Sequence, residues 1–131
     1  MDYMFLIYTD EQRMAQISLD EAKSAITHHW EIMDEASAKG VFKTASPLMP
    51  SFTAVTVRSQ NGRPTVTDGP FIETKEALGG YYIIDCRNDE EALYWAKRLA
   101  DGTCGSTVEF RALRAIPSRE ECEQSAAAVN A

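Results

Sequence analysis

The sequence predicts an α+β domain in which two helices cover one face of a ferredoxin-like antiparallel sheet. Two continuous apolar runs, at residues 3–8 and 81–84, have the length and composition of central strands. A helical pattern follows each run, and two β-branched segments lie between them. The predicted order is therefore β-α-β-β, a hairpin strand, and then β-α-β.

Composition sets the size and class of the protein. The chain has 131 residues, of which 44% are hydrophobic and 25% charged, so we expect one domain with one core over residues 1–116 and a polar tail over 117–131. The formal net charge of −7 disfavours nucleic acid as a partner, because a phosphate backbone attracts basic surfaces.

The three cysteines, Cys86, Cys104 and Cys122, are odd in number and form no C-x-x-C pattern. This spacing predicts neither a disulfide framework nor a zinc site, and it favours a reducing cytoplasm. The N-terminus has no basic region, and its apolar run is far too short to span a bilayer, so we expect no export signal and no membrane insertion.

In the first half of the chain, we expect a loop at 9–16 and then a long helix. Ser18 and Glu21 have the spacing of a capping box, and Gly40 stands where a helix C′ residue belongs. The helix should present an apolar stripe made by Leu19, Ala22, Ile26, Met33 and Ala36.

Strands are then expected at 41–49 and 52–58, and Asn61-Gly62 predicts a type I′ hairpin turn. Further on, Asp89 should open a second helix, and 107–113 alternates like a strand with Val108 and Phe110 facing inward. The helix should be buried through Ala92, Leu93, Ala96 and Leu99. Ser118 could cap a short helix in a surface appendage.

Residues 67–80 contain the densest group of ionisable side chains, beside an Asp-Gly-Pro turn and a glycine pair. Asp68 and Glu73 are candidate catalytic carboxylates, and Phe71 should face inward or toward a partner. Alternatively, Asp68 caps its own turn and residues 73–77 form one exposed helical turn. Arg58 could pair with one of these carboxylates or remain an exposed arginine at a strand end.

Two adjacent histidines lie in the first helix. At 100° per residue His29 falls within the apolar stripe and points toward the sheet, where it is a candidate acid/base. The alternative is a core histidine that is hydrogen-bonded to a backbone carbonyl. His28 and His29 point in different directions, so neither metal nor cofactor is expected.

The central strands are apolar on both faces, whereas two helices can cover one. Leaving the other face wet would forfeit about 1.5–3 kcal/mol for each large side chain. The side chains concerned are Tyr3, Phe5, Ile7, Tyr81 or Tyr82, and Ile83 or Ile84. We therefore predict a homodimer that packs sheet to sheet.

Residues 68–76 read DGPFIETKE and are followed by LGGYY at 78–82. These residues, with YMFLIY at 3–8 and VEFR at 108–111, resemble the DGPF-type branch of the YCII-related family over residues 3–116. The resemblance implies a dimeric α/β-barrel fold and a possible role beside extracytoplasmic-function sigma factors. In the wider family a His and an Asp are thought to act in a cleft; no histidine here is assigned to that position, and Arg111-Ala112 replaces the branch's usual Arg-Pro.

Two functions remain open from the sequence. In the first, a cofactor-independent enzyme uses Asp68, Glu73 or His29 for proton transfer on a small substrate, while Lys75, Arg58 or Arg111 offset developing charge. In the second, the chain is a non-catalytic ligand-binding or regulatory accessory domain, with any small molecule bound in a groove at the dimer interface. A purely structural dimer is the third possibility.

Overall fold

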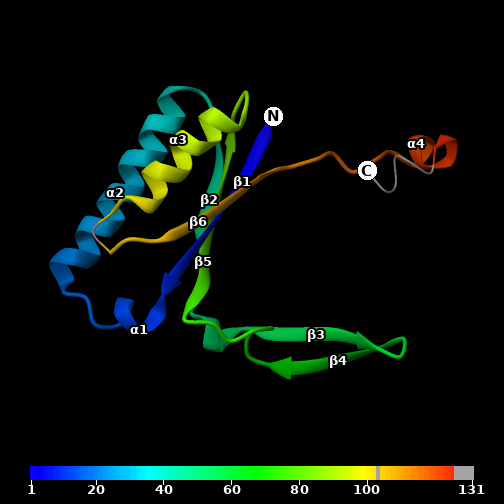
Figure 1. Cartoon of the computed structure of the whole chain (residues 1–131), viewed down its shortest axis with the longest axis horizontal. Helices are drawn as coiled ribbons and strands as arrows, with labels where there is room; N and C mark the ends of the chain where they lie inside the picture. The colour runs from blue at the N-terminus through cyan, green and yellow to red at the C-terminus, as the bar shows by residue number, and fades with distance from the viewer. Residues whose placement is uncertain (103, 126–131) are drawn as a thin grey trace.

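The computed structural model describes residues 1–102 and 104–125, so the end of the expected polar tail, 126–131, lies outside the described residues. Its main sheet is antiparallel with the strand order β2-β5-β1-β6. The central strands are β1 (Asp2–Asp10) and β5 (Glu76–Asp85), and the edges are β2 (Phe42–Pro47) and β6 (Thr107–Ala112). Helices α2 (Leu19–Ala38) and α3 (Asp89–Ala100) cover one face (Figure 1). The predicted α+β class and element order are confirmed.

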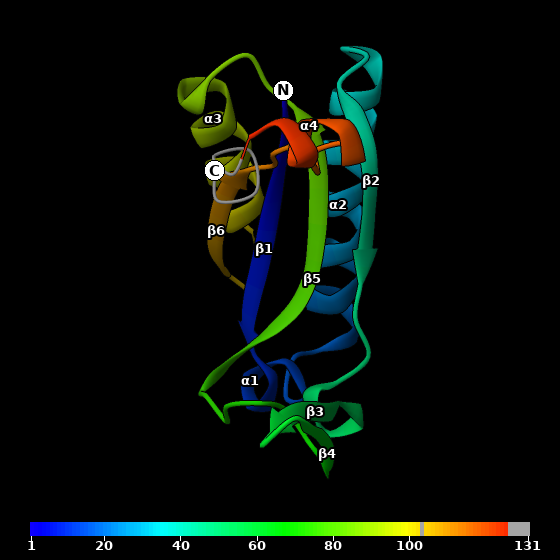
Figure 2. The same ribbon diagram turned by 90° about the vertical axis from the view of Figure 1, so that its right-hand side faces the viewer.

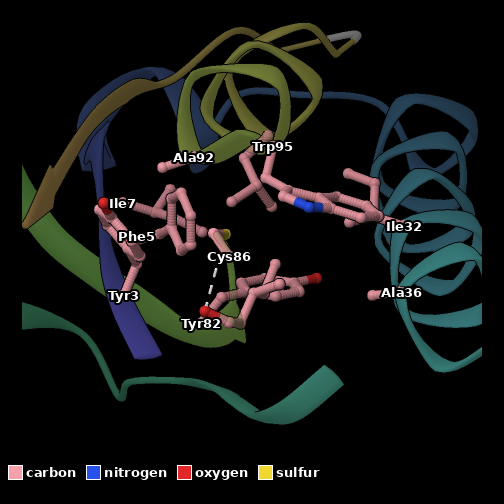
Figure 3. Packing of buried hydrophobic residues seen from close by; sticks show 11 residues of the cluster. Tyr3, Phe5, Ile7, Ile32, Ala36, Tyr82, Cys86, Ala92 and Trp95 are labelled. Atoms are coloured by element: carbon pink, nitrogen blue, oxygen red, sulfur yellow. Dashed lines mark hydrogen bonds between the residues drawn. The ribbon is translucent and has the colours of Figure 1, made fainter. Parts of the chain in front are cut away.

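The core lies between this face and the two helices. Strand alternation places Tyr3, Phe5 and Ile7 on the helix side of β1, where they are buried. Phe5 is opposite Tyr82 on β5 and Phe110 on β6, so all three strands contribute to one apolar layer. Figure 3 shows the β1 and β5 side chains of this layer facing Trp95 of α3 and Ile32 and Ala36 of α2.

Within the part of the chain that the structure describes, no helix packs on the sheet's other face, as the sequence predicted, but the residues of that face differ from those expected. Tyr3, Phe5 and Ile7 were expected on the uncovered face, yet all three point toward the helices. Their neighbours Met4, Leu6 and Tyr8 point the other way and are half-buried, as are Tyr81 and Ile83. We call the surface made by these five side chains the open face.

Helix α2 begins and ends where the sequence predicted, but the side chains that it turns toward the sheet differ from the predicted apolar stripe. Ser18 and Glu21 form the capping box, and Gly40 has a φ of +72°. The row that faces the sheet has Ile32 and Ala36 buried and Ala22, Ala25 and His29 half-buried, whereas Leu19 and Ile26 are 70% and 51% exposed. Steps of three and four residues hold this row on one side of the helix, and Leu19 and Ile26 fall outside it. The expected loop at 9–16 contains a short helix, α1 (Glu11–Met14), capped by Asp10.

Helix α3 opens at Asp89, as predicted, with Asn88 as its N-cap. It is buried through Ala92, Trp95 and Leu99, whereas the expected Leu93 is 46% exposed. Glu35 of α2 connects the two helices, because it accepts hydrogen bonds from Tyr94 Oη at 2.6 Å and from Arg98 Nη2 at 3.2 Å.

A separate two-stranded hairpin interrupts the domain between β2 and β5. It consists of β3 (Val55–Gln60) and β4 (Arg63–Asp68), and Asn61 and Gly62 have φ values of 51° and 78°, as a type I′ turn requires. A 3₁₀ helix, η1 (Ser51–Thr53), occupies the start of the strand expected at 52–58. Figure 1 shows the hairpin projecting from the end of the sheet, on the side opposite the helices.

Beyond β6 the chain also leaves the body on the side of the open face. There it forms an exposed helix, α4 (Arg119–Gln124), with a capping box between Ser118 and Glu121. Figure 2 looks onto the open face, with α4 in front of one end of the sheet and the hairpin at the other. Among the described residues, no helix is both long and apolar enough to cross a membrane.

Candidate functional site

A cavity of about 460 Å³ lies between α2 and the sheet, near α1. Ile7, Met33 and Leu99 contribute to its apolar wall, and His29 and Tyr82 also line it. Ligand sites in proteins are commonly concave, mostly apolar and about 300–1,000 Å³ in volume, with a small number of placed polar groups. The size and lining of this cavity fit a small organic molecule.

The glycine pair that the sequence singled out forms part of the cavity wall. A Cβ on Gly80 would lie 3.0 Å from the carbonyl oxygen of Ser46 and 3.3 Å from Cα of Pro47. The backbones of β5 and β2 therefore approach closely at this point, and glycine leaves the necessary space. Gly79 lies at a bulge, since Ile7 pairs with Gly80 and Tyr8 pairs with Leu78.

His29 and Tyr82 form a hydrogen-bonded pair in the cavity wall, which His28, Thr9, Ser46 and Ser106 also line. Nδ1 of His29 lies 2.8 Å from Oη of Tyr82, and the two rings are stacked with an interplanar angle of 24°. Burial lowers the pKa of His29 below its usual value, and the nearby His28 lowers it further. Burial also raises the pKa of Tyr82 to about 12. At neutral pH both side chains are therefore uncharged.

His28 has a structural role. Its Nε2 lies 2.7 Å from the carbonyl oxygen of Arg98, so it donates a hydrogen bond that joins α2 to the end of α3. A Cβ on Gly102 would approach the His28 ring to 3.3 Å. A histidine bonded to a backbone carbonyl was the alternative considered for His29, and the structure places that arrangement at His28 instead.

The charged stretch after β4 is separate from the cavity wall. Asp68 ends the hairpin, Glu73 and Lys75 lie in the following segment, and all three are exposed. The residue set lining the cavity includes none of these three, although it includes His29. The helical turn considered for 73–77 does not form, because β5 begins at Glu76.

The two candidate arginines also lie elsewhere. The guanidinium carbon of Arg58 is 4.5 Å from the centroid of the Phe71 ring, so Arg58 contacts an aromatic face on the hairpin side. Phe71 remains 62% exposed. Arg111, on the edge strand β6, has Nε 4.0 Å from Oε2 of Glu109. Of the six candidate site residues, His29 is the one that the structure brings to the cavity.

Tyr82 is the site residue that sequence reasoning missed as a functional candidate. It was assigned to an apolar strand, where a tyrosine is usually core. A signal was nevertheless present, because strand alternation puts Tyr82 on the same face as Phe5 once β1 and β5 are paired. The hydroxyl of a buried tyrosine needs a partner, and an inward-facing His29 on the covering helix supplies one.

A second hollow, of about 250 Å³, adjoins the cavity and shares with its wall Thr9, Met14, Cys104, Gly105 and Ser106. Its remaining lining is polar and includes Arg13 and Glu76. Over residues 1–102 and 104–125, no group of three His, Cys, Asp or Glu side chains is arranged to hold a metal ion.

Comparison with known proteins gives a family-level match. The model of the YCII-related domain matches residues 1–114. An uncharacterized protein of Rhizobium meliloti (strain 1021) is 35% identical over 101 residues, which cover 77% of this chain and 82% of the relative. The match spans β1 through β6, so it includes the helix that carries His29 and the strand that carries Tyr82.

Proposed function

Because the chain belongs to the YCII-related family, we propose that it is a cofactor-independent enzyme whose His29 moves a proton on a small organic substrate. The observation that carries this proposal is the hydrogen-bonded His29–Tyr82 pair in the wall of a 460 Å³ cavity. Perturbed titratable groups in a concave apolar site are typical of catalytic acids and bases.

The electrostatics of the pair suit proton transfer near neutral pH. A histidine with a lowered pKa is unprotonated at pH 7 and can accept a proton. In the tautomer with the proton on Nδ1, His29 donates to the Tyr82 oxygen and offers the Nε2 lone pair as a base. In the other tautomer the Tyr82 hydroxyl donates to Nδ1, and Nε2–H is a hydrogen-bond donor to the substrate. Once the basic tautomer has accepted a proton at Nε2, the imidazolium is the acid that returns it. The pair can therefore serve either direction of transfer.

The lining of the cavity favours a substrate that is mainly apolar. Side chains such as Ile7, Met33 and Leu99 would exclude water from the reacting atoms, which strengthens each remaining polar interaction. The adjoining polar hollow with Arg13 and Glu76 could receive a polar substituent of the same molecule. An aromatic or alicyclic compound with one polar end fits both compartments.

We also propose a branch within the family, a homodimeric assembly and a cellular location. The DGPFIETKE run at 68–76 supports the DGPF-type branch. The half-buried apolar side chains of the open face support a homodimer of the dimeric α/β-barrel type, because a second sheet would remove them from water. The free thiols of Cys86, Cys104 and Cys122 support a cytoplasmic location.

A second candidate is a non-catalytic domain that binds a small ligand in the same cavity and regulates a partner system. The placement of Asp68 and Glu73 favours it, since both carboxylates expected to share in the chemistry lie outside the residue set lining the cavity. On this reading His29 and Tyr82 recognise a ligand by hydrogen bonding alone.

A substrate screen separates the two candidates. Compounds would first be selected by thermal stabilisation of the protein, which follows RT ln(1 + [L]/Kd), and then assayed for turnover. We expect His29→Asn to lower the rate by about 10²–10⁴-fold while stabilisation by the compound remains, because one acid/base group contributes that much. The control variants Asp68→Asn and Glu73→Gln should keep the parental rate.

Parental turnover in His29→Asn would overturn the acid/base role. Stabilising compounds that no form of the protein converts would favour the ligand-binding candidate. If the Asp68 and Glu73 variants lost activity while His29→Asn retained it, the chemistry would belong to the charged stretch instead.

A further inference from the structure

Among residues 1–102 and 104–125, no sheet or helix packs against the valine side of the β3–β4 hairpin, residues 55–68. Val57 lies directly opposite Val66 in the register, and Val55 lies two residues earlier on the same face. These three side chains, which we call the valine face, are 60–68% exposed. A two-stranded hairpin alone is marginally stable in water, so an exposed apolar face on it requires a covering surface.

The opposite, polar face of the hairpin is contacted by the segment that follows β4. Arg58 contacts the ring of Phe71, and Thr56 Oγ1 donates to the carbonyl oxygen of Gly69 at 2.8 Å. The segment that follows β4 therefore folds against the polar side and leaves the valine side free. This is the reverse of the arrangement expected of a hairpin that ends in solvent.

The solvent-accessible surface area of the chain is large enough to accommodate a partner. The chain exposes 9601 Å². A compact monomer of this mass would expose about 6,900 Å², so the excess is about 2,700 Å², whereas a standard interface removes about 800 Å² from each partner. The projecting hairpin and residues 113–125, which also leave the body, add to this surface (Figure 1). One partner could cover the open face and the valine face together.

We propose that the hairpin is an arm that packs its valine face on the body of a second copy of this chain. The hairpin projects on the same side of the sheet as the open face, so a body seated on that face would also meet the hairpin (Figures 1 and 2). A second copy offers a matching apolar sheet. A two-fold axis lying in the plane between the two sheets would make each arm contact the other body.

The arm also gives a role to the charged stretch at 68–76, whose Asp68, Glu73 and Lys75 do not line the cavity. Gly69, with a φ of +97°, and Pro70 turn the chain at the base of the arm. The hydrogen bond from the Gly69 amide to the Ala54 carbonyl, at 2.7 Å, closes that base. The contact between Arg58 and Phe71 then holds the following segment against the arm. The DGPF residues thus orient an arm.

The arm inference rests on the sheet-to-sheet dimer proposed above, and sedimentation velocity over a dilution series tests both. We expect the unmodified chain to be a dimer and the double variant Val57→Lys/Val66→Lys to raise the dimer Kd by about 30-fold or more, because buried interface anchors typically contribute 2 kcal/mol or more. Thr67→Lys adds a charge to the opposite face of the same hairpin, and its Kd should stay within about threefold of the parental value.

Hydrogen exchange supplies a second measurement that does not depend on the valine double variant folding. In the unmodified dimer the amides of residues 55–68 should be protected, and the open-face variant Leu6→Lys, which we expect to be monomeric, should lose that protection while β1 and β5 keep theirs.

A dimer whose Kd is unchanged in the valine double variant would overturn the arm inference and leave the sheet-face dimer intact. A hairpin that exchanges rapidly within the dimer would do the same. A monomeric parental chain would overturn both the arm and the dimer. None of these outcomes affects the cavity, because ligand stabilisation and turnover are measured separately.

Discussion

The imidazole of His29 both stacks on the ring of Tyr82, with centroids 5.8 Å apart, and shares a hydrogen bond of 2.8 Å with its hydroxyl. The pair joins the helix that covers the sheet to the sheet itself. Its two members come from residues 53 positions apart in the chain. It is therefore a tertiary contact as well as a candidate reactive group, and both properties can be measured.

Acid should destabilise the protein partly through His29. Burial lowers the pKa of His29 below 6.5, so as the pH falls the unfolded chain binds this proton before the folded chain does. The contribution to the free energy of unfolding is complete above about pH 6.5 and is lost as the pH falls through the folded-state pKa. Urea denaturation at pH 7.5 and pH 5 should show a smaller acid loss for His29→Asn than for the parental chain.

Asparagine is the matched change because its amide can still bond to Tyr82 without titrating near neutrality. An identical acid loss in both proteins would contradict the assignment of this proton to His29.

Removing the Tyr82 hydroxyl should cost stability while keeping the aromatic packing. Tyr82→Phe leaves Nδ1 of His29 without its partner, and we expect a loss of about 1–2 kcal/mol in the free energy of unfolding. Tyr81→Phe, on the open face of the same strand, is the control and should change it by less than about 0.5 kcal/mol. Equal effects in chemical denaturation would show that the bond contributes nothing.

The two glycines of β5 should differ in their tolerance of alanine. The Cβ added in Gly80→Ala meets the backbone of Ser46 and Pro47, whereas the Cβ added in Gly79→Ala meets the Thr9 hydroxyl, also at 3.0 Å, which a side-chain rotation can move. We expect about 1–3 kcal/mol of destabilisation for Gly80→Ala and less than about 1 kcal/mol for Gly79→Ala. Thermal unfolding in which Gly79→Ala is the weaker protein would refute this reading of the β2–β5 contact.

Glu35 should connect α2 and α3 measurably but weakly. The Tyr94 hydroxyl, followed by Lys39 and Arg98, lowers the pKa of this partly exposed carboxyl. We expect Glu35→Gln to cost about 0.5–1 kcal/mol, because solvent screens such pairs. Glu31→Gln, one turn earlier on the exposed side of α2, should be neutral. A double-mutant cycle with Tyr94→Phe would locate the coupling, and a coupling energy of zero would exclude it.

The sequence predicted the elements that depend on local rules. Capping at Ser18, termination at Gly40 and the turn at Asn61-Gly62 are each set by a few neighbouring residues, and the structure confirms all three. The inward direction of His29 followed from helical periodicity alone. These features need no knowledge of how distant segments meet.

What the sequence did not predict depends on register between distant segments. A run that is apolar throughout, such as 3–8, does not reveal which of its alternating side chains faces the helices, and the expectation for Tyr3, Phe5 and Ile7 was wrong. The partner of His29 was missed for the same reason, because Tyr82 reaches it only after β1 and β5 pair. The charged residues at 68–76 were grouped by sequence proximity, whereas the fold places Asp68 at the end of the hairpin and Glu73 and Lys75 in the exposed segment that follows.

The three thiols differ sharply in their surroundings. Cys86 is 1% exposed, and burial, with Glu91 nearby, raises its pKa to about 11; Cys104 is also buried, but Cys122 on α4 is exposed. Because thiolate and access govern alkylation, a maleimide dye should label the native chain at Cys122 alone. Cys122 is thus a single site for attaching a fluorescent dye. Energy transfer between two labelled chains would report directly how far apart their α4 helices lie.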